Sequence, residues 1–460
     1  MQEKKVNRVS VKIPSWVILA QCIAFVILYA IWAQPETILI RHVCLILGAL
    51  FGVYEIFQFR HSFLTKAALP AWLILALFVW MTFHLFFLSN DFNLQLTEYM
   101  GIWKRTAIGF IFAMGLGLAL GNKTEKYYWW IIFCGLLAPS LIYLAKYCIT
   151  YYGVPDQITI PTWLRLFPGS APFYIPKTSY VVFCLPLLAV SLGMIQQNIF
   201  SNQWISTKNV ILFLAICLTL LVFYLENILN GEVYGAILIM IFSISLVSRW
   251  IISLKILKKI IILLILAIIL VGATVYVSKN LYTSQKVINL NADLKLVLNP
   301  DKYTQWKKSV GALPINETGA PAHIKYYSRL SWAYNALGLI AKNPLGYGLI
   351  EQSFGHLAKI EWPDSDLTQS HSGWIDLALG IGIPGVIMVL LALGISMKFI
   401  KNNNSDWGMS GFYLLLALAL LWITTEVSQR VFFDSLIFTV ALVSGISLSY
   451  SSLKNKAQEK

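Results

Sequence analysis

Residues 329–348, RLSWAYNALGLIAKNPLGYG, and residues 369–385, QSHSGWIDLALGIGIPG, close the one long polar stretch of this chain, which begins near residue 279. The sequence on either side of that stretch is almost entirely apolar. A chain with a single large segment outside the membrane is expected to carry out its chemistry in that segment. These two motifs are therefore the first candidates for a functional site.

The composition of the 460 residues is that of a protein embedded in a membrane. Hydrophobic residues make up 58% of the chain and charged residues only 12%, whereas a soluble domain carries about 25% charged residues. The basic N-terminus, MQEKKVNRVSVK, is followed by an apolar run too long for a cleavable signal peptide, so we expect the first span to be retained. The sequence therefore predicts an all-α polytopic membrane protein.

About twelve apolar runs are long enough to cross roughly 30 Å of hydrocarbon as helices. They lie near residues 13–33, 37–58, 68–88, 99–120, 127–148, 178–196, 209–226, 232–248, 257–277, 373–397, 408–428 and 433–452. The pattern predicts three parts: residues 1–277 with nine spans, residues 278–372 as a large loop with short interfacial helices, and residues 373–460 with three spans.

Basic residues outside the large loop concentrate in short segments on one side of the predicted bundle. The N-terminus with Lys4 and Lys5 belongs to this side, as do the segments around Lys258 and Lys398. Short loops rich in Lys and Arg stay in the cytoplasm, and long loops are exempt from this bias. We therefore expect both termini inside and the large loop outside.

The formal net charge of +14 does not indicate a nucleic-acid partner. The basic residues are spread over span ends, where they set topology and meet anionic lipid, and they do not form one basic face with interleaved aromatic residues. The six cysteines fall in or beside apolar runs without CxxC spacing, so we expect neither a disulfide framework nor a metal site. Membrane lipids are the expected surroundings, and nucleic acid is not an expected ligand.

The large loop is predicted to contain an amphipathic helix along the outer membrane surface. From Tyr326 onward, apolar residues recur at helical spacing, at Leu330, Ala333, Leu337 and Ile340. The run stops at Asn343-Pro344, with Lys342 in its last turn, as helix ends prefer. Gly346, Gly348 and Gly355 then predict a flexible connection, and His371 leads directly into the tenth span.

Charged residues near the outer ends of the spans form a second candidate site, because such groups are costly in lipid. Lys104 and Arg105 lie about six residues into the fourth span, roughly 9 Å deep. Glu426 and Arg430 have the i,i+4 spacing that allows pairing on one helix face. Arg165 and Lys177 flank a shorter outer loop. Such cations could hold a phosphate group at headgroup level; equally, Lys104 and Arg105 could snorkel to the interface and Arg329 could contact lipid headgroups.

The two motifs together resemble the signature of the O-antigen ligase and polymerase superfamily. That signature places an Arg before a helix, then a Pro-Gly-Gly turn, and then a His beside a Gly-rich helix start; Arg329, the segment NPLGYG and His371 match these positions. The motif similarity covers about sixty residues, and the twelve-span pattern with a late outer loop is typical of the ligases. The resemblance implies His371 and Arg329 as the catalytic residues, with neither a metal ion nor another cofactor.

The chain departs from the family pattern at two positions. Members often carry a further Arg before the span that corresponds to residues 232–247, where this chain reads ENILNGEVYG without a basic residue. Lys104, Arg105, Lys177, Arg165 or Arg430 would then have to bind the pyrophosphate, with Glu426 orienting Arg430. The histidine is also followed by Ser372, where Asn is common.

The resemblance implies a glycosyltransferase that uses a glycan linked to undecaprenyl pyrophosphate as its donor. For a ligase the acceptor is the lipid A-core, on the periplasmic face of a Gram-negative inner membrane, in lipopolysaccharide biosynthesis. A histidine changes protonation near neutral pH, which favours His371 as the general base in a reaction that inverts the anomeric carbon. A polysaccharide polymerase and a protein O-glycosylating oligosaccharyltransferase share the motif. A transporter is a third class, but it would be expected to show inverted repeats and midplane charges.

Overall fold

The structure is a computed structural model that describes residues 13–123, 125–152, 161–166, 175–203, 206–253, 285–308, 311–403, 405–425 and 430–458. The chain divides into two compact units. The first unit comprises Met1–Ile239, Gly385–Ile423 and Gln429–Lys460, and the second comprises Met240–Pro384 and Thr424–Ser428.

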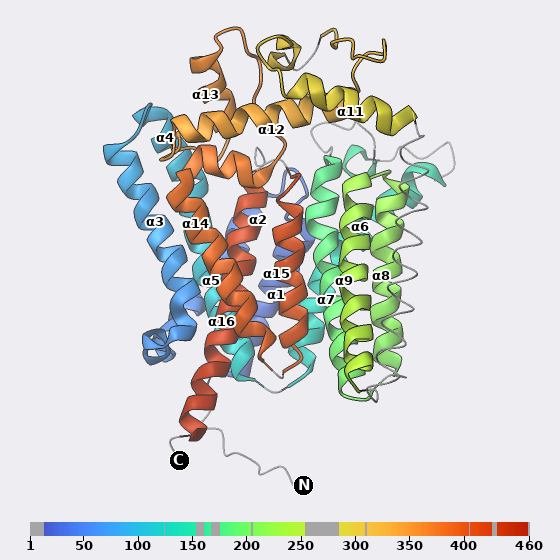
Figure 1. Cartoon of the computed structure of the whole chain (residues 1–460). Helices are drawn as coiled ribbons and strands as arrows, with labels where there is room; N and C mark the ends of the chain where they lie inside the picture. The colour runs from blue at the N-terminus through green and yellow to red at the C-terminus, as the bar shows by residue number, and fades with distance from the viewer. Residues whose placement is uncertain are drawn as a thin grey trace. The chain divides into compact units, whose positions relative to one another are not determined.

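The first unit is a bundle of long apolar helices that run side by side (Figure 1). They are α1 (Ser15–Ile31), α2 (Ile38–Gln58), α3 (Leu69–Phe87), α5 (Lys104–Asn122), α6 (Tyr127–Tyr151), α7 (Lys177–Phe200), α8 (Thr207–Leu225), α15 (Gly408–Leu421) and α16 (Arg430–Gln458). Short helical segments join some of them: η1 (Arg60–Leu64), η2 (Lys66–Ala68), α4 (Phe92–Glu98), η3 (Tyr99–Trp103) and η4 (Thr162–Leu164). Two further helices, α9 (Leu229–Ser253) and α14 (Gly373–Lys401), have one part in each unit.

The helices agree with the spans expected from the sequence. Among the described residues, nine helical segments are long and apolar enough to cross a membrane, and α1 and α15 are shorter apolar helices. The predicted span at residues 257–277 lies outside the described residues. Helices satisfy every backbone polar group within one segment, which lipid requires. The prediction of an all-α polytopic membrane protein is confirmed, and the count of twelve spans stays a prediction.

Two contacts show which chain segments share one end of the first unit. The Tyr128 hydroxyl at the start of α6 donates to the Ser15 carbonyl at the start of α1, at 3.4 Å. Ser62, just after α2, donates to the Ser452 hydroxyl in the last turns of α16, at 3.0 Å. Since α1 and α2 are consecutive antiparallel helices, the start of α1 and the last turns of α16 lie at the same end. This agrees with both termini on one side, while the orientation in the membrane stays a prediction.

The helices α2, α5 and α16 approach one another closely at glycines. A Cβ added to Gly115 of α5 would overlap Gly52 of α2, and a Cβ added to Gly117 would overlap the Leu442 carbonyl of α16. On the facing side, a Cβ on Gly445 would lie 2.6 Å from the Met114 carbonyl oxygen. Small residues allow helix backbones to pack tightly in lipid, where no hydrophobic force drives helices together. These glycines therefore fix the position of α5 between α2 and α16.

Replacing Gly117 by alanine should destabilise the protein, because the added methyl group overlaps backbone atoms that no side-chain rotation can move. We expect a cost of about 1–3 kcal/mol, as for other overpacked cores. The measurement is the thermal melting of the purified protein in detergent. Gly394→Ala on α14 is the matched control, since a Cβ there meets nothing within 4 Å. Equal melting temperatures for the two variants would contradict the packing argument.

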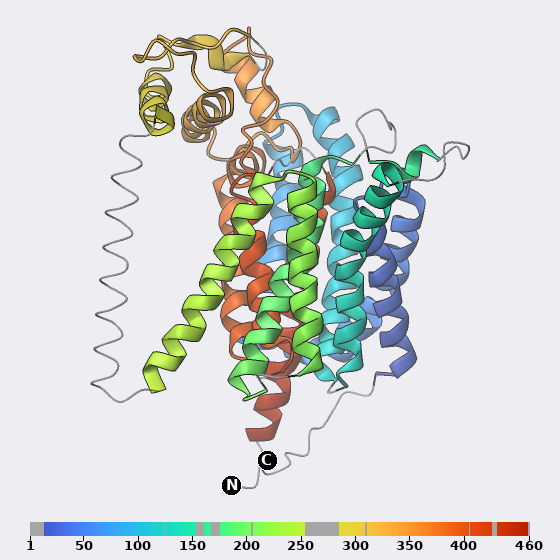
Figure 2. The ribbon, with the colours of Figure 1, turned by 90° about the vertical axis from the view of Figure 1, so that its right-hand side faces the viewer.

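The described residues of the second unit form four further helical segments: α11 (Gln285–Val297), η6 (Thr304–Lys307), α12 (Ile324–Lys342) and α13 (Ser353–Glu361). Figure 2 shows α11 and α12 side by side, seen nearly end-on. A compact hydrophobic core joins these helices to the first turns of α14, and its buried members include Leu296, Trp306, Tyr327, Trp332, Leu349, Phe354 and Leu379. The large loop is thus a folded unit with its own core.

The helix predicted at the end of the polar stretch is present as α12, which stops at Lys342 directly before Asn343-Pro344. The predicted stripe is only partly outside the core of the second unit. Leu330 is 39% exposed and Leu337 is 58% exposed, whereas Ile340 packs partly buried against the core. The placement of α12 along the membrane surface stays a prediction.

The glycine-rich segment after α12 is held in place by the start of α14. The amides of Tyr347 and Gly348 donate to the carbonyls of Leu379 and Gly380, both at 2.8 Å, and the Ile383 amide donates to the Pro344 carbonyl at 2.9 Å. Helix α14 is interrupted at this contact, where Gly382 has φ +73°. Gly346 also has a positive φ, of +83°, which favours glycine.

The flexible connection expected at Gly346, Gly348 and Gly355 is therefore not what the structure contains. The first two glycines form the fixed backbone contact with α14, and Gly355 lies inside α13. A Cβ on Gly346 would overlap the Gly380 carbonyl and the Gly382 amide. The glycines are needed for close approach of two backbones, which a sequence pattern does not distinguish from flexibility.

Candidate functional site

His371 lies in the short segment that leads from α13 into α14, and its backbone conformation is unusual. Its φ of +59° places it in the left-handed region, which a residue with a side chain adopts only when its surroundings impose it. The Asp376 carboxylate accepts a hydrogen bond from the buried Ser370 amide at 2.8 Å, and the Asp376 amide donates to the Ser372 carbonyl at 2.8 Å. The turn on both sides of His371 is thereby tied to the first turn of α14.

The imidazole ring of His371 stacks on the indole ring of Trp332 from α12. The ring centroids are 5.0 Å apart and the ring planes differ by 20°. Trp332 is buried, and its Nε1 donates to the Trp306 carbonyl at 2.8 Å. Trp306 in turn packs edge-on against Trp362. His371 therefore rests on an aromatic platform that the core of the second unit holds rigid.

Tyr327 supports the same platform one turn earlier in α12. Its side chain is fully buried, and its hydroxyl donates to the Tyr303 carbonyl at 3.0 Å. Burial raises the pKa of Tyr327 to about 12, because an ionised phenol is poorly solvated there. The hydroxyl is therefore a proton donor at every physiological pH, and it links α12 to the segment around η6.

Arg329 occupies the turn of α12 next to Trp332. Residues three apart on a helix are neighbours on its surface, so the guanidinium projects from the same region of α12 as the ring that carries His371. Arg329 is exposed, which leaves its planar fork of donors accessible to an anion. Arg329 therefore lies one turn of α12 before Trp332, on whose ring His371 stacks, and the catalytic roles of Arg329 and His371 stay predictions.

The first unit contains a buried ion pair at the end where α1 ends and α2 begins, which we call the cation end. Arg105 Nε donates to Asp434 Oδ2 at 2.5 Å, and the Thr106 hydroxyl donates to Asp434 Oδ1 at 2.7 Å. The side chains of Arg105 and Asp434 are 15% and 6% exposed. Arg105 of α5 is therefore fixed against α16, and Asp434 is a site residue that the sequence motifs did not indicate.

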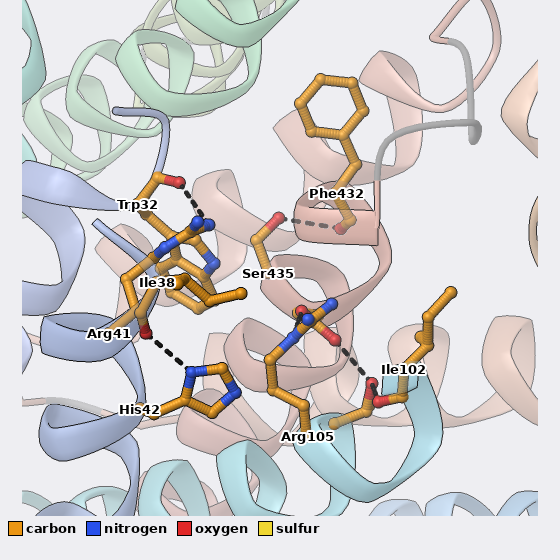
Figure 3. A network of polar contacts seen from close by, with 10 residues as sticks. Trp32, Ile38, Arg41, His42, Ile102, Arg105, Phe432 and Ser435 are labelled. Atoms are coloured by element: carbon orange, nitrogen blue, oxygen red, sulfur yellow. Dashed lines mark hydrogen bonds and ion pairs between the residues drawn. The ribbon is translucent and has the colours of Figure 1, made fainter. Parts of the chain in front are cut away.

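Arg41 of α2 joins this pair and was also missed from the predicted site. Its Nη1 donates to the Trp32 carbonyl at 3.2 Å, and its charge interacts with those of both Arg105 and Asp434. Figure 3 shows Arg41 and Arg105 reaching from α2 and α5 into one polar network beside Ser435 of α16. Among the described residues, neither Arg41 Nε nor Arg105 Nη2 has a hydrogen-bond acceptor although both atoms are buried. The sequence feature that could have identified Arg41 is its position four residues into an apolar run.

Two arginines lie beside one carboxylate, so this network has a net positive charge and buried N–H donors without an acceptor. Buried N–H groups without an acceptor are costly, and a phosphate oxygen is the acceptor that guanidinium groups fit best. This arrangement can therefore bind an anion at the cation end.

The structure places the other predicted cations in three different environments. Lys104 is exposed at the first residue of α5, directly beside Arg105. Arg430 is exposed at the first residue of α16, and its Nη1 would lie 3.8 Å from a Cβ on Gly101 of η3, so it too lies near the start of α5. These two residues share the cation end with Arg105.

Lys177 instead belongs to a separate network with Glu226 at the end of α8. Its Nζ donates to the Glu226 carbonyl at 2.7 Å and lies 3.8 Å from the Glu226 carboxylate. The Tyr143 hydroxyl of α6 donates to the same carboxylate at 3.0 Å. Arg165 follows η4 in the segment whose Leu166 amide bonds to Thr150 at the end of α6. Glu426 lies outside the described residues, so its predicted pairing with Arg430 is untested.

A family model described as O-antigen ligase matches residues 209–390, a range that contains Arg329, the platform residue Trp332 and His371. The match covers less than half of the chain and supports the O-antigen ligase superfamily as the family that this part of the chain resembles. No curated protein gives a significant match to the chain. The family implies a glycosyltransferase-like enzyme that acts on lipid-linked glycans, by ligase-type or polymerase-type transfer. The long apolar helices support a membrane protein.

Removing the Asp376 carboxylate should loosen the turn that carries His371. Asp376→Ala leaves the buried Ser370 amide without its acceptor, which costs about 1–3 kcal/mol. We expect faster hydrogen exchange in the peptide that spans residues 366–376, measured by mass spectrometry on the purified protein. Asp364→Ala, at an exposed position in the same loop, should leave that exchange unchanged. If the two variants exchange alike, Asp376 does not hold the His371 turn.

Proposed function

We propose that this protein is an O-antigen ligase of lipopolysaccharide biosynthesis in Gram-negative bacteria. It would transfer a polysaccharide from undecaprenyl pyrophosphate to the lipid A-core on the periplasmic face of the inner membrane. The observation that carries the proposal is that the range matched by the family model contains His371 stacked on Trp332, with the exposed Arg329 one turn of α12 before that ring. Both residue types suit the transfer of a glycan from a pyrophosphate.

The proposed reaction needs one base and several cations. His371 accepts the proton of the acceptor hydroxyl, and the hydroxyl oxygen attacks the anomeric carbon from the side opposite the pyrophosphate. The bond between that carbon and the pyrophosphate oxygen breaks, and undecaprenyl pyrophosphate leaves with the electron pair. The configuration of the anomeric carbon is inverted. Arg329 stabilises the negative charge that develops on the leaving group.

The cations predicted from the sequence that lie at the cation end of the first unit are candidates for binding a pyrophosphate in their own right. Arg105 has a fixed orientation through Asp434, and Lys104 and Arg430 add charge beside it. Arg41 is our candidate for the arginine that the segment ENILNGEVYG lacks, since it has a buried donor without an acceptor. Lys177 contributes less in this proposal because Glu226 already balances its charge. Arg165 stays a further candidate.

His371→Ala should abolish ligation in a strain that lacks the native gene. A positioned general base contributes about 10²- to 10⁴-fold to a rate, so the variant should leave almost no polysaccharide on the lipid A-core. The readout is the lipopolysaccharide ladder on a gel, with expression verified by immunoblot. His323→Ala is the matched control, an exposed histidine of the same loop at the start of α12. A normal ladder from His371→Ala would refute the mechanism.

The deletion strain itself separates the ligase from the alternatives. Loss of the whole ladder with accumulation of lipid-linked polymer supports the ligase. A single repeat on the lipid A-core supports a polymerase instead, because chain extension then fails before transfer. An unchanged ladder with loss of glycan from protein supports a protein-glycosylating oligosaccharyltransferase.

A charge-balanced double variant tests whether Arg105 binds the donor or only stabilises the fold. Arg105→Gln alone removes the hydrogen-bonded charge partner of the buried Asp434 carboxylate, which costs about 3–5 kcal/mol. Arg105→Gln with Asp434→Asn removes both charges and should recover the melting temperature. We expect transfer to stay about 10²- to 10³-fold lower in the double variant, because a donor to the leaving group is missing.

The same experiment applies to Arg41 with a matched control on its own helix. Arg41→Gln should lower transfer without lowering the melting temperature by a comparable amount. The control is Arg60→Gln. Arg60 is exposed just beyond the other end of α2, where its guanidinium covers the Phe57 ring, so this variant should leave transfer unchanged.

For the Arg105/Asp434 double variant, recovery of both the melting temperature and transfer would show that the ion pair is purely structural.

A further inference from the structure

A cavity of about 460 Å³ opens at the cation end of the first unit, apart from the Arg105–Asp434 pair. Its walls come from the last residue of α1, the turn after it, one face of α6, and η4. The residues that matter for its chemistry are Ile31, Gln34, Glu36, Ile142, Lys146 and Trp163. All of them belong to the first unit, so the cavity is complete within one compact part of the chain.

Lys146 lines this cavity although its charge is almost entirely removed from water. Only 5% of the residue is exposed, and its Nζ donates to the Gln34 side-chain oxygen at 2.8 Å. An ammonium group carries three N–H donors, and a neutral amide oxygen does not balance its charge. Within the described segments no carboxylate lies within 4.0 Å of this nitrogen.

Glu226, the acidic residue that contacts the same part of α6, already has hydrogen-bond and ion-pair partners. Glu226 accepts from the Tyr143 hydroxyl, one turn before Lys146, and pairs with Lys177. Glu36 lines the cavity but is itself exposed. A buried cation without a counter-ion is strongly unfavourable in a membrane protein, and such a residue commonly marks a binding site. Among the described residues, no carboxylate is therefore available to balance the charge of Lys146 in the cavity.

The remaining walls show what kind of molecule would carry that anion. Ile31 and Ile142 give the cavity an apolar surface, and the Trp163 ring at η4 is 53% exposed. Tryptophan favours the level of lipid headgroups, where its ring meets both apolar and polar surroundings. An apolar wall beside a buried ammonium matches an amphiphile with an anionic headgroup, and in a bilayer that anion is a phosphate.

We propose that this cavity, the Lys146 cavity, binds a phosphate-headed lipid. The phosphate occupies the position beside the Lys146 ammonium, and the first part of the hydrocarbon chain lies along Ile31, Ile142 and Trp163. The site uses none of the residues assigned to glycan transfer. It would hold either a glycerophospholipid or a polyprenyl phosphate, since both present a phosphate joined to an apolar chain.

Native mass spectrometry of the delipidated full-length protein can test this site. The probes are phosphatidylglycerol, undecaprenyl phosphate and, as a lipid without phosphate, diacylglycerol. We expect the wild type to bind the two phosphate lipids, and Lys146→Gln to bind them at least about tenfold more weakly. Lys126→Gln, an exposed lysine at the opposite end of α6, is the matched control and should bind like the wild type.

Trp163→Ala provides a second variant at an exposed position, so loss of binding there does not reflect loss of the fold. This variant should weaken the binding of every lipid whose hydrocarbon chain lies along Trp163, while the melting temperature of the protein stays unchanged. The relative affinities of phosphatidylglycerol and undecaprenyl phosphate identify the source of the phosphate. Equal affinities of the wild type and Lys146→Gln for both phosphate lipids would overturn the proposal, as would diacylglycerol binding as tight as that of phosphatidylglycerol.

Discussion

The backbone contact between residues 344–348 and the broken start of α14 is the constraint on which the second unit depends. Three backbone hydrogen bonds cross this contact, and glycines at 346 and 382 allow it because no Cβ would fit on either side. The contact fixes the end of α12 relative to the start of α14. Trp332 lies on α12 and His371 lies directly before α14, so their ring stacking depends on this backbone contact between the two elements.

The elements of this fold could be predicted from the sequence far better than their contacts. Apolar length alone located the spans from α1 to α16, and periodicity located α12, because lipid and helix geometry act on local sequence. The stacking of His371 on Trp332 joins residues 39 positions apart, and no local pattern specifies it. The same reason explains why the role of the glycines at 346 and 382 was not predicted. The sequence shows that these positions have no side chain, but only the facing backbone shows that a side chain would not fit.

Charge placement in the first unit follows a similar division. The sequence identifies Arg105 and Lys177 as cations near span ends, which is a local property. It does not show that Asp434 and Glu226, 329 and 49 residues later, accept hydrogen bonds from them or pair with them. Arg41 and Lys146 are not among the site residues predicted from the sequence. The structure gives these two residues more weight than the paired cations, because the partner of each cation decides whether its charge is available to bind an anion.

A paired cation and an unpaired one make different contributions to anion binding. Asp434 holds Arg105 in one orientation, which lowers the entropy that binding would otherwise cost, but it also cancels one unit of charge. Arg41 and Lys146 donate only to neutral oxygens, a backbone carbonyl and an amide, so their charge is not cancelled by those bonds. In the two proposed sites, Arg41 and Lys146 therefore supply most of the attraction for a phosphate, while Arg105 supplies direction. Since Arg41 and Lys146 belong to different networks, the first unit has the chemistry for two separate phosphate groups at its cation end.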